Sequence, residues 1–443
     1  MQPSPTLRRL AGVAAVALAL AACGDDEPGT EPTETEMTET PSGTESPTPF
    51  SLGGAPGLGD GTFTIARVLP ETGALGFLGA PMIAGTALAI QDINAAGGLF
   101  GQDVAFLEFD SATDPTVALP NVNTAFAQGA DVLVGAGASS ITKSTLEGLS
   151  ALGIPSCTPS ATSGELSSLR TASKLFRTVP SDEFVVGIIA NEIVNDGNAE
   201  KVVIVARADA YGDFMAEQLG PALGSVGIAS DAIATIKYDP AATDLSSEAG
   251  QVAAENPTAV VIVGFDEAGP LIRTLLEEPN SLDPTTFYGA DGVFSSQLPG
   301  LAGVSIDGMK VIGAAGSTEF NQRLADAGTA DFIYGGQAYD CTILLALWAA
   351  LEETDDSSQW DAANLAGLTK EGEKCTDFAG CLALIEAGTD IDYDGASGAL
   401  EMAPGNPGGD STAGEPTVSV YAVAQFQDGA LTPVSSTEVD LTS

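Results

Sequence analysis

Hydroxyl side chains follow one of the apolar runs, where a helix is expected to begin. Residues 131–134 are typical of a buried strand; Ser139 and Ser140 come soon after, with Thr142 close behind. Hydroxyl donors, free amides and the dipole of a helix N-terminus together suit a carboxylate. The two serines therefore predict a carboxylate-binding site, and helix capping is the alternative interpretation of the same residues.

Histidine is absent from the whole chain. This excludes Ser-His-Asp and Cys-His nucleophiles, histidine general bases and histidine-ligated zinc. Carboxylate or lysine catalysis, as in a carboxylate-dependent hydrolase, stays chemically possible, but no cluster of such residues indicates it. We therefore expect a binding protein without a cofactor rather than an enzyme.

Two further motifs suggest ligands that we consider less favoured. Residues 390–401 match the calcium-loop spacing D-x-D-x-D-G-x5-E, but Pro404 and Pro407 stand where an exit helix would follow. Residues 135–137 read Gly-Ala-Gly after a strand, without the third glycine of a dinucleotide loop. We expect no metal or nucleotide, while the calcium alternative stays open.

The N-terminus has the pattern of an export signal. Arg8 and Arg9 precede an apolar stretch over 10–20, which is shorter than the roughly 20 residues that a membrane-spanning helix needs. The ending Leu-Ala-Ala-Cys resembles the bacterial lipobox, which implies that Cys23 becomes an acylated N-terminus. An ordinary secretory signal with a chance cysteine is the alternative.

The segment after Cys23 has the composition of a linker. Residues 24–50 are mostly Thr, Glu, Pro, Gly and Ser without Lys or Arg, so they cannot bury a core. We predict a signal peptide over 1–22, an acidic tether over 23–60, and a protein anchored by lipid to the outer face of the cell membrane.

Charge and cysteines narrow the partners and the compartment. The chain has 60 acidic and 15 basic residues, which argues against nucleic acid as a partner. With Cys23 lipidated, an even number of cysteines remains for disulfides in an oxidising compartment. Cys375 and Cys381 are near enough to bridge locally; Cys157 and Cys341 then pair by elimination. A four-thiolate metal site is the alternative.

From about residue 61, strand-like and helical segments alternate. This order is typical of an α/β fold in which parallel sheets are covered by helices on both faces. Two such series, before and after about residue 180, predict two doubly wound lobes, and a helix over 335–352 could return to the first lobe. The expected strands are 63–68, 104–109, 131–134, 201–205, 259–263 and 309–312, and the expected helices are 79–95, 115–128, 142–152, 182–195, 211–226, 244–255 and 267–277.

Six blocks, in this order, carry a family resemblance: AIQDINAAGGLFGQDVAFLEFDSATDP (89–115), VGAGASSIT (134–142), GIPSCTPSATS (153–163), DAYG (209–212), FYGADGV (287–293) and GGQAYDC (335–341). The chain resembles the type I periplasmic binding proteins, specifically the branched-chain amino acid binding family of ABC importers. The resemblance implies two lobes joined by three crossovers, with lobe one at 61–180 and 317–414 and lobe two at 181–316 and 415–443. It also implies a cleft between the lobes that closes over a solute.

The resemblance places the carboxylate end of a ligand at two loops of lobe one. Ser139 and Ser140 match the first loop. Ser160, Ala161 and Thr162 match the second loop, whose backbone amides and hydroxyl grip the same end of the ligand in the family.

Four further positions match the rest of that site. Tyr211 matches the lobe-two tyrosine that closes over the ligand, and Asp291 falls at the acidic position that pairs with the substrate ammonium. Phe265 stands where the family often has a tyrosine, and Leu78 where an aromatic residue often shapes the side-chain pocket. Ile141 replaces a further serine. These departures allow a changed ligand.

The sequence therefore predicts an extracytoplasmic solute-binding lipoprotein that hands an amino acid or related solute to an ABC permease. A ligand sensor of the same fold is the alternative, as is a binding protein for an amide, urea or an aromatic acid.

Overall fold

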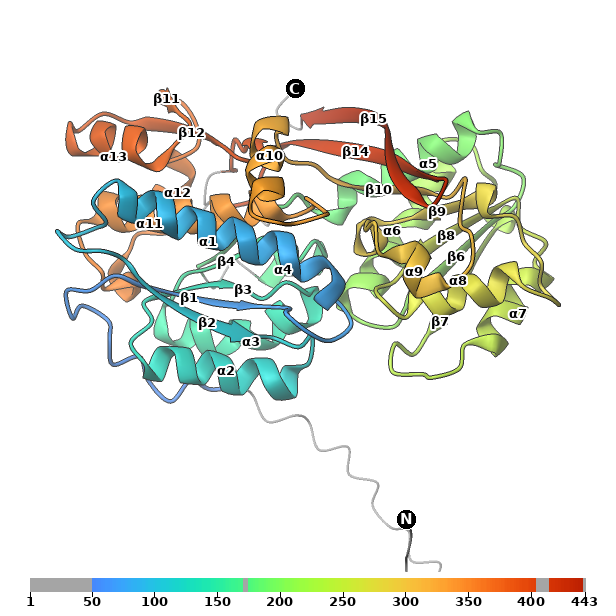
Figure 1. The fold of residues 1–443 in the computed structure, drawn as a ribbon, viewed down its shortest axis with the longest axis horizontal. Coiled ribbons are helices and arrows are strands. Elements are labelled where there is room, and N and C mark those ends of the chain that lie inside the picture. The colour runs from blue at the N-terminus through green and yellow to red at the C-terminus, as the bar shows by residue number, and fades with distance from the viewer. Residues whose placement is uncertain (1–49, 170–173, 404–413, 441–443) are drawn as a thin grey trace, which may run out of the picture. The chain divides into compact units, whose positions relative to one another are not determined.

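The structure, a computed structural model, describes residues 50–169, 174–403 and 414–440 (Figure 1). Within this part of the chain, helices cover two large sheets of an α/β fold. Residues 1–49, which include the expected lipidation site Cys23, lie outside the described residues.

Lobe one is built on a parallel five-stranded sheet in the order β2-β1-β3-β4-β5. The central strand β1 is buried along its whole length. The helical segment Gly76–Ala95, which is η1 and α1 together, is long and apolar enough to cross a membrane, but α1 packs against α11 in this lobe. The elements are β1 (Thr64–Leu69), η1 (Gly76–Leu78), α1 (Gly79–Ala95), β2 (Ala105–Asp110), α2 (Pro115–Ala127), β3 (Val132–Gly135), α3 (Ser139–Leu152), β4 (Ser156–Thr158), α4 (Glu165–Leu169) and β5 (Leu175–Arg177).

Lobe two is built on a seven-stranded sheet in the order β15-β14-β10-β9-β8-β6-β7. Its first part consists of α5 (Asp182–Asn195), β6 (Val202–Arg207), α6 (Ala210–Ser225), η3 (Ser230–Ala232), β7 (Ile233–Tyr238), α7 (Ser246–Ala254), β8 (Ala259–Val263), α8 (Ala268–Leu276), η4 (Pro284–Thr286), β9 (Phe287–Gly289), η5 (Asp291–Val293), α9 (Leu298–Ala302) and β10 (Lys310–Ala314). Strands β6 to β10 are parallel.

The edge of the second sheet differs from the expected all-parallel arrangement. Strand β14 (Val418–Gln427) pairs antiparallel with β10, and β15 (Ala430–Asp440) pairs antiparallel with β14. The apolar-run pattern missed both strands because β14 alternates buried and half-exposed residues, and most of β15 is exposed.

Between β10 and β14 the chain returns to lobe one. These elements are α10 (Thr318–Asp326), α11 (Gly335–Glu352), η6 (Ser357–Gln359), α12 (Asn364–Gly367), β11 (Glu373–Cys375), α13 (Phe378–Glu386), β12 (Ile391–Gly395) and β13 (Gly398–Ala399). Helix α11 packs on α1, β3 and β4. A disulfide between Cys157 and Cys341 ties β4 to α11, and a second, between Cys375 and Cys381, ties β11 to α13.

One predicted boundary is wrong for the described residues, and the segment of the calcium-loop alternative has a structure of its own. The tether was expected to reach residue 60, yet Leu52 is buried and Phe50 packs against the core of lobe one, because both side chains are apolar. The calcium-loop segment forms strand β12, where Asp392 and Asp394 both pair with the Lys374 ammonium, at 2.8 and 2.9 Å.

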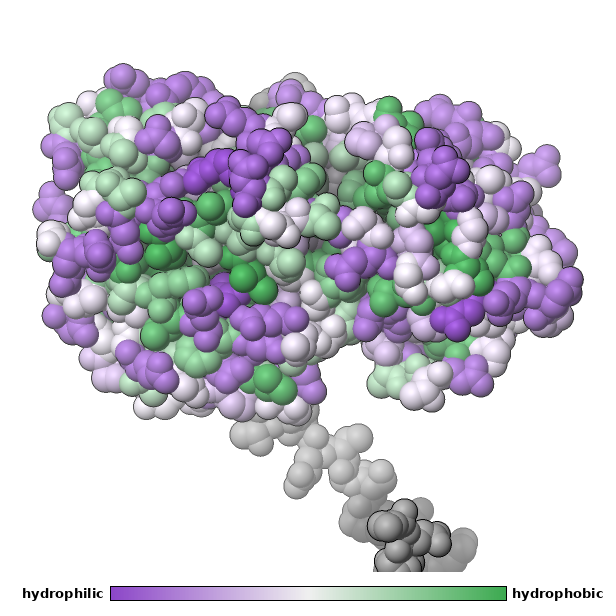
Figure 2. Space-filling model, in the orientation of Figure 1, coloured by the Kyte–Doolittle hydropathy of each residue, from purple (hydrophilic) through white to green (hydrophobic). Residues whose placement is uncertain are grey.

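Hydrophilic side chains cover much of the face shown in Figure 2, and hydrophobic ones gather along α1. This distribution agrees with a chain whose acidic excess is spread over a solvated surface. Among the described residues, no group of three or more Cys, Asp or Glu side chains is arranged to hold a metal ion.

Asp131, at the start of β3, gives a test of stability against pH. Burial raises its pKa to about 8, the Thr64 amide (2.7 Å) opposes this, and the charges of Asp355, Asp60 and Asp356 add to it. The folded state therefore keeps a proton that the unfolded chain releases near pH 4, so stability falls as pH rises from about 4 to 8.

We expect Asp131→Asn to raise the free energy of unfolding by about 1–3 kcal/mol at pH 8, and by little at pH 4. The asparagine oxygen still accepts the Thr64 bond, and no proton is needed. Urea unfolding at both pH values measures the effect, with exposed Asp103→Asn as control. A gain of the same size at pH 4 and pH 8 would contradict the assignment.

Candidate ligand-binding site

A small cavity lies where the carboxyl ends of strands from both sheets meet, as expected for open α/β sheets. Its walls come from the loops after β1, β3 and β4 in lobe one and from the loops after β6, β8 and β9 in lobe two. The lining residues are Leu75, Gly137, Ala138, Ser139, Ser160, Thr162, Tyr211, Phe265, Asp291, Gly292 and Tyr334. Six of the nine residues that the sequence predicted are brought together here.

The lobe-one wall is suited to an anion. Helix α3 begins at Ser139, earlier than expected, and Ala138 at the N-cap position has no side chain able to cap the helix. The Ile141 and Thr142 amides donate to the Ala138 carbonyl oxygen at 3.1 and 2.9 Å. The two amides before them, of Ser139 and Ser140, have no acceptor within the helix and can serve another one. Ser160 is buried beside them and donates from Oγ to the Gly137 carbonyl oxygen at 2.8 Å.

Three predicted residues do not line the cavity. Ser140 is half-buried on the next position of α3. Leu78 is fully buried in the core, and Leu75, one turn earlier, faces the cavity in its place. Ala161 packs in a small apolar cluster, and its amide already donates to Thr158 Oγ1 at 3.1 Å. The expected role for the Ala161 amide is therefore wrong.

Arg177, at the end of β5, holds the second ligand loop in place. It is fully buried, and its Nη1 donates to the carbonyl oxygens of Ala161, Thr162 and Ser163 at 3.2, 2.9 and 3.1 Å. Its Nη2 pairs with Glu415 Oε1 at 2.7 Å. With its carbonyls fixed by one guanidinium, the loop presents Thr162 to the cavity. Sequence reasoning did not detect this role.

The lobe-two wall contains a buried carboxylate, Asp291, at the start of η5. It is 4% exposed, Tyr211 donates to its Oδ1 at 2.5 Å, and Tyr334 donates to its Oδ2. Burial raises the pKa of Asp291 and the two tyrosine hydroxyls oppose this rise. Each carboxylate oxygen can accept a further bond, so Asp291 can still take a ligand donor.

Tyr334 was missed because its position depends on an unusual backbone. It precedes α11 with φ 64, in the left-handed region that only about a few per cent of non-glycine residues adopt. Burial, and after it the charge of Asp291, raises the pKa of Tyr334 well above its usual value. The hydroxyl therefore stays protonated and donates. The glycines that follow it are the only sequence signal of this turn.

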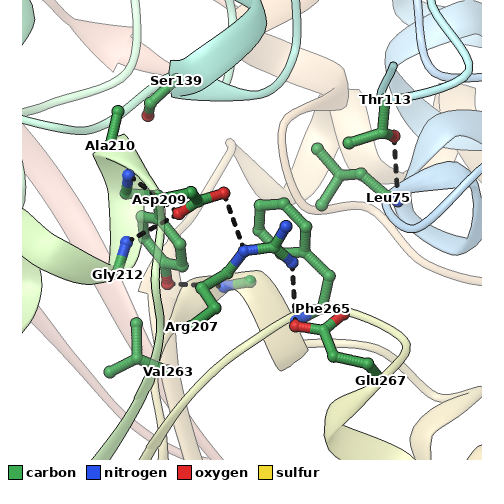
Figure 3. Close-up of polar contacts among 12 residues, drawn as sticks. Leu75, Thr113, Ser139, Arg207, Asp209, Ala210, Gly212, Val263, Phe265 and Glu267 are labelled. Atoms are coloured by element: carbon green, nitrogen blue, oxygen red, sulfur yellow. Dashed lines mark hydrogen bonds and ion pairs between the residues drawn. The ribbon is translucent and has the colours of Figure 1, made fainter. Parts of the chain in front are cut away.

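The Phe265 ring contacts a cation, which lies over it in Figure 3, and also a second ring. The Arg207 guanidinium lies 3.7 Å from the Phe265 ring centroid, and Tyr211 stacks on the Phe265 ring at 5.5 Å between centroids. Arg207 is itself fixed by Asp209 at 2.8 Å and Glu267 at 2.9 Å. Stacking on Phe265 helps to orient the Tyr211 ring, whose hydroxyl points toward Asp291.

A second buried carboxylate, Asp182, lies in an adjoining cavity. That cavity shares Thr162 and Asp291 with the first and is also lined by Tyr421. Burial raises the pKa of Asp182 well above normal, the nearby charge of Asp291 adds to it, and the Thr162 side chain opposes it. Neither carboxylate oxygen of Asp182 accepts a hydrogen bond at a normal distance and angle. Sequence reasoning gave this residue only a helix-start role.

The cavity beside Asp291 has about 10 Å³ of space that water can enter. This is about enough for one water molecule. The two walls are therefore nearly in contact, and an organic ligand can enter only if they part.

The match to a known protein family identifies the family of this chain. The model described as periplasmic binding protein matches residues 62–400, which is most of the chain. The chain belongs to the periplasmic binding protein family. Members are binding proteins, so the expectation of a non-enzymatic protein agrees with the family.

Individual relatives of this periplasmic binding protein extend the comparison. It is 25% identical over 343 residues to a Leu/Ile/Val-binding protein of Rhizobium johnstonii, covering 76% of this chain and 91% of that one. It is 26% identical over 387 residues to a chemotactic signal transduction system substrate-binding protein of Halobacterium salinarum, covering 83% and 88%.

A solved structure shows the same architecture. The crystal structure of a branched-chain amino acid transporter substrate-binding protein from Streptococcus pneumoniae, in complex with isoleucine, matches with a TM-score of 0.66 at 20% identity, covering 85% of this chain and 99% of that one. This likeness shows the type I fold of the periplasmic binding protein, as the sequence predicted.

Proposed function

We propose that this protein captures an amino acid with an apolar side chain between its lobes and delivers it to an ABC permease. The carboxylate end of the ligand would lie against the start of α3, Ser160 and Thr162. Its ammonium would lie between Asp291 and Asp182. The lobes would part to admit it and close around it.

The pair of buried carboxylates carries this proposal. Asp291 and Asp182 are both almost fully buried and influence each other's charge. No lysine or arginine lines either cavity; the charge of Arg177 lowers the pKa of Asp182, but Arg177 is already paired with Glu415. A buried carboxylate without a cation is costly unless it is protonated. A ligand ammonium supplies the missing charge and can replace the proton.

The remaining walls favour an apolar side chain. Leu75 and the Phe265 ring are both buried and both face the cavity. Contact with such surfaces stabilises aliphatic groups by about 25 cal/mol per Å² removed from water. The site therefore suits leucine, isoleucine or valine better than an acidic or strongly polar amino acid.

Aromatic acids and sensing are the competing proposals. A purely anionic ligand would meet two carboxylates and gain nothing from them, so the cleft disfavours benzoate-like acids. A sensory role is favoured by one specific observation, the similarity to the chemotactic binding protein of Halobacterium salinarum. Genes for a permease and an ATPase beside this one would support import; those for a kinase or cyclase would support sensing.

A thermal-shift screen tests the ligand class. We expect leucine, isoleucine or valine at about 1 mM to raise the melting temperature by several degrees, because a ligand that binds only the folded state stabilises it. Benzoate, acetamide and urea at the same concentration should leave it unchanged. A shift with benzoate and none with any amino acid would contradict the proposal.

We also propose that Cys23 carries a lipid and that the following acidic segment tethers the binding domain to the membrane. The support is the lipobox-like ending Leu-Ala-Ala-Cys and the tether composition. Radioactive palmitate fed to cells should label the wild type and not Cys23→Ala, because only the cysteine thiol accepts the lipid. Cys375→Ala, altered in a different cysteine, should still be labelled. Equal labelling of wild type and Cys23→Ala would overturn the anchor.

A further inference from the structure

We propose that a second cavity, outside the cleft, binds a neutral, apolar small molecule. This hairpin cavity lies between the β14–β15 hairpin, the end of β10, α10 and the loop at 330–333, and water can enter about 600 Å³ of it. Ligand pockets typically have about 300–1,000 Å³. The hairpin cavity is therefore large enough for a two-ring molecule.

Small side chains in the sheet create this space. Ala422 and Ala424 share one face of β14, where larger residues would fill it. Phe294 and Phe332 form apolar walls around these alanines. Such a surface favours an aromatic or aliphatic ligand by removing apolar area from water.

The polar groups of the cavity decide the charge of its ligand. Asn321 contributes a neutral amide side chain to the lining. Asp331 already accepts from Ser295 Oγ at 2.7 Å and from the Ser296 amide at 2.9 Å. No lysine or arginine lines the cavity, and its one acidic side chain disfavours an anion.

The hairpin cavity lies next to the amino-acid cleft. On the loop before α11, Ile333 faces the cavity and the next residue, Tyr334, faces the cleft and donates to Asp291. At Gly313, an added Cβ would lie 2.8 Å from Ile333 Cδ1, 3.2 Å from Phe294 Cδ2 and 3.3 Å from Asp291 Cβ. A molecule held in the cavity would therefore press on the same segments that hold Asp291.

2-Naphthol, a neutral two-ring alcohol, is a suitable probe because its fluorescence reports binding. We expect one site on the full chain with a dissociation constant on the order of 100 µM, from the size of the molecule. 2-Naphthoate, which has the same two rings but carries a negative charge, should bind at least about fivefold more weakly because Asp331 lines the cavity. Failure of 2-naphthol to bind, or tighter binding of 2-naphthoate, would overturn the proposal.

Variants locate the probe. Ala422→Trp fills the cavity and should weaken 2-naphthol binding at least about tenfold; the smaller change Ala422→Leu should weaken it about threefold. Ala387→Leu, at an exposed position after α13, is the control and should bind like the wild type. If Ala422→Trp fails to fold, Ala422→Leu still tests the site.

The variant Asp291→Asn tests whether 2-naphthol binds in the hairpin cavity or in the cleft. This variant should keep 2-naphthol binding, whatever the outcome of the amino-acid screen, because Asp291 does not line the hairpin cavity. Loss of 2-naphthol binding in Asp291→Asn, or unchanged binding in both cavity variants, would place the probe elsewhere and overturn the proposal.

Discussion

Replacing Asp291 by asparagine should weaken amino-acid binding at least about thirtyfold, because removing one member of a buried charge pair costs roughly 2–5 kcal/mol. Asparagine keeps the shape of the side chain, and the hydroxyls of Tyr211 and Tyr334 can turn to meet its amide. The ligand ammonium, however, loses its closest charge. Titration calorimetry with the amino acid found in the thermal-shift screen measures the loss.

Matched variants separate charge from shape at this site. Asp182→Asn should also weaken binding, since its carboxylate lies in the adjoining cavity with both oxygens unpartnered. Asp231→Asn, exposed on η3 in the same lobe, should change nothing. Ser139→Ala should cost less than Asp291→Asn because backbone amides remain for the carboxylate. If Asp291→Asn binds as tightly as wild type, the ligand has no ammonium there and the amino-acid proposal fails.

Arg177→Met should lower the free energy of unfolding by about 3–5 kcal/mol, as expected when one partner of a buried ion pair is removed. The change leaves the Glu415 carboxylate without its guanidinium and three loop carbonyls without their donor. Urea unfolding measures the stability. Amino-acid affinity should fall as well, because the loop that carries Thr162 loses its fixed position.

Arg273→Met is the matched control for this prediction. Arg273 is half-buried and, like Arg177, donates to carbonyl oxygens, here those of Ala302 and Leu301. These two residues lie at the end of α9, away from the cleft. We expect a loss of about 1 kcal/mol there and unchanged affinity. Equal losses of stability in the two arginine variants would show that the Glu415 pair has no special importance.

Local pattern was sufficient to predict most of the helices and the central strands. The expected helix over 79–95 agrees with α1, and the expected strand over 259–263 agrees with β8. Both are decided by short-range properties, namely a run of helix-compatible residues and a buried β-branched run. The β14–β15 hairpin was not predictable in this way, because its pairing with β10 depends on a contact made more than 100 residues away in sequence.

The chemistry of the site was predictable only in part. Ser139, Ser160, Thr162, Tyr211, Phe265 and Asp291 could be located through the family resemblance, and the structure places them around one cavity. Asp182 and Tyr334 carry no such signal: one starts a helix like many aspartates, and the other lies beside two glycines. Their importance arises from burial, which removes water from Asp182 and turns the Tyr334 hydroxyl toward Asp291.

By itself, the sequence determined the class of protein: an α/β chain with an export-type N-terminus, no histidine chemistry and a hydroxyl pair at the start of a helix. These follow from residue types and short spacings, which local physics interprets directly. Only the tertiary structure decided which groups meet around the small cavity, that Arg177 binds the carbonyl oxygens of the loop after β4 while it pairs with Glu415, and that alanines leave a second cavity. Those outcomes depend on packing between segments far apart in the chain, and packing is a property of the whole fold.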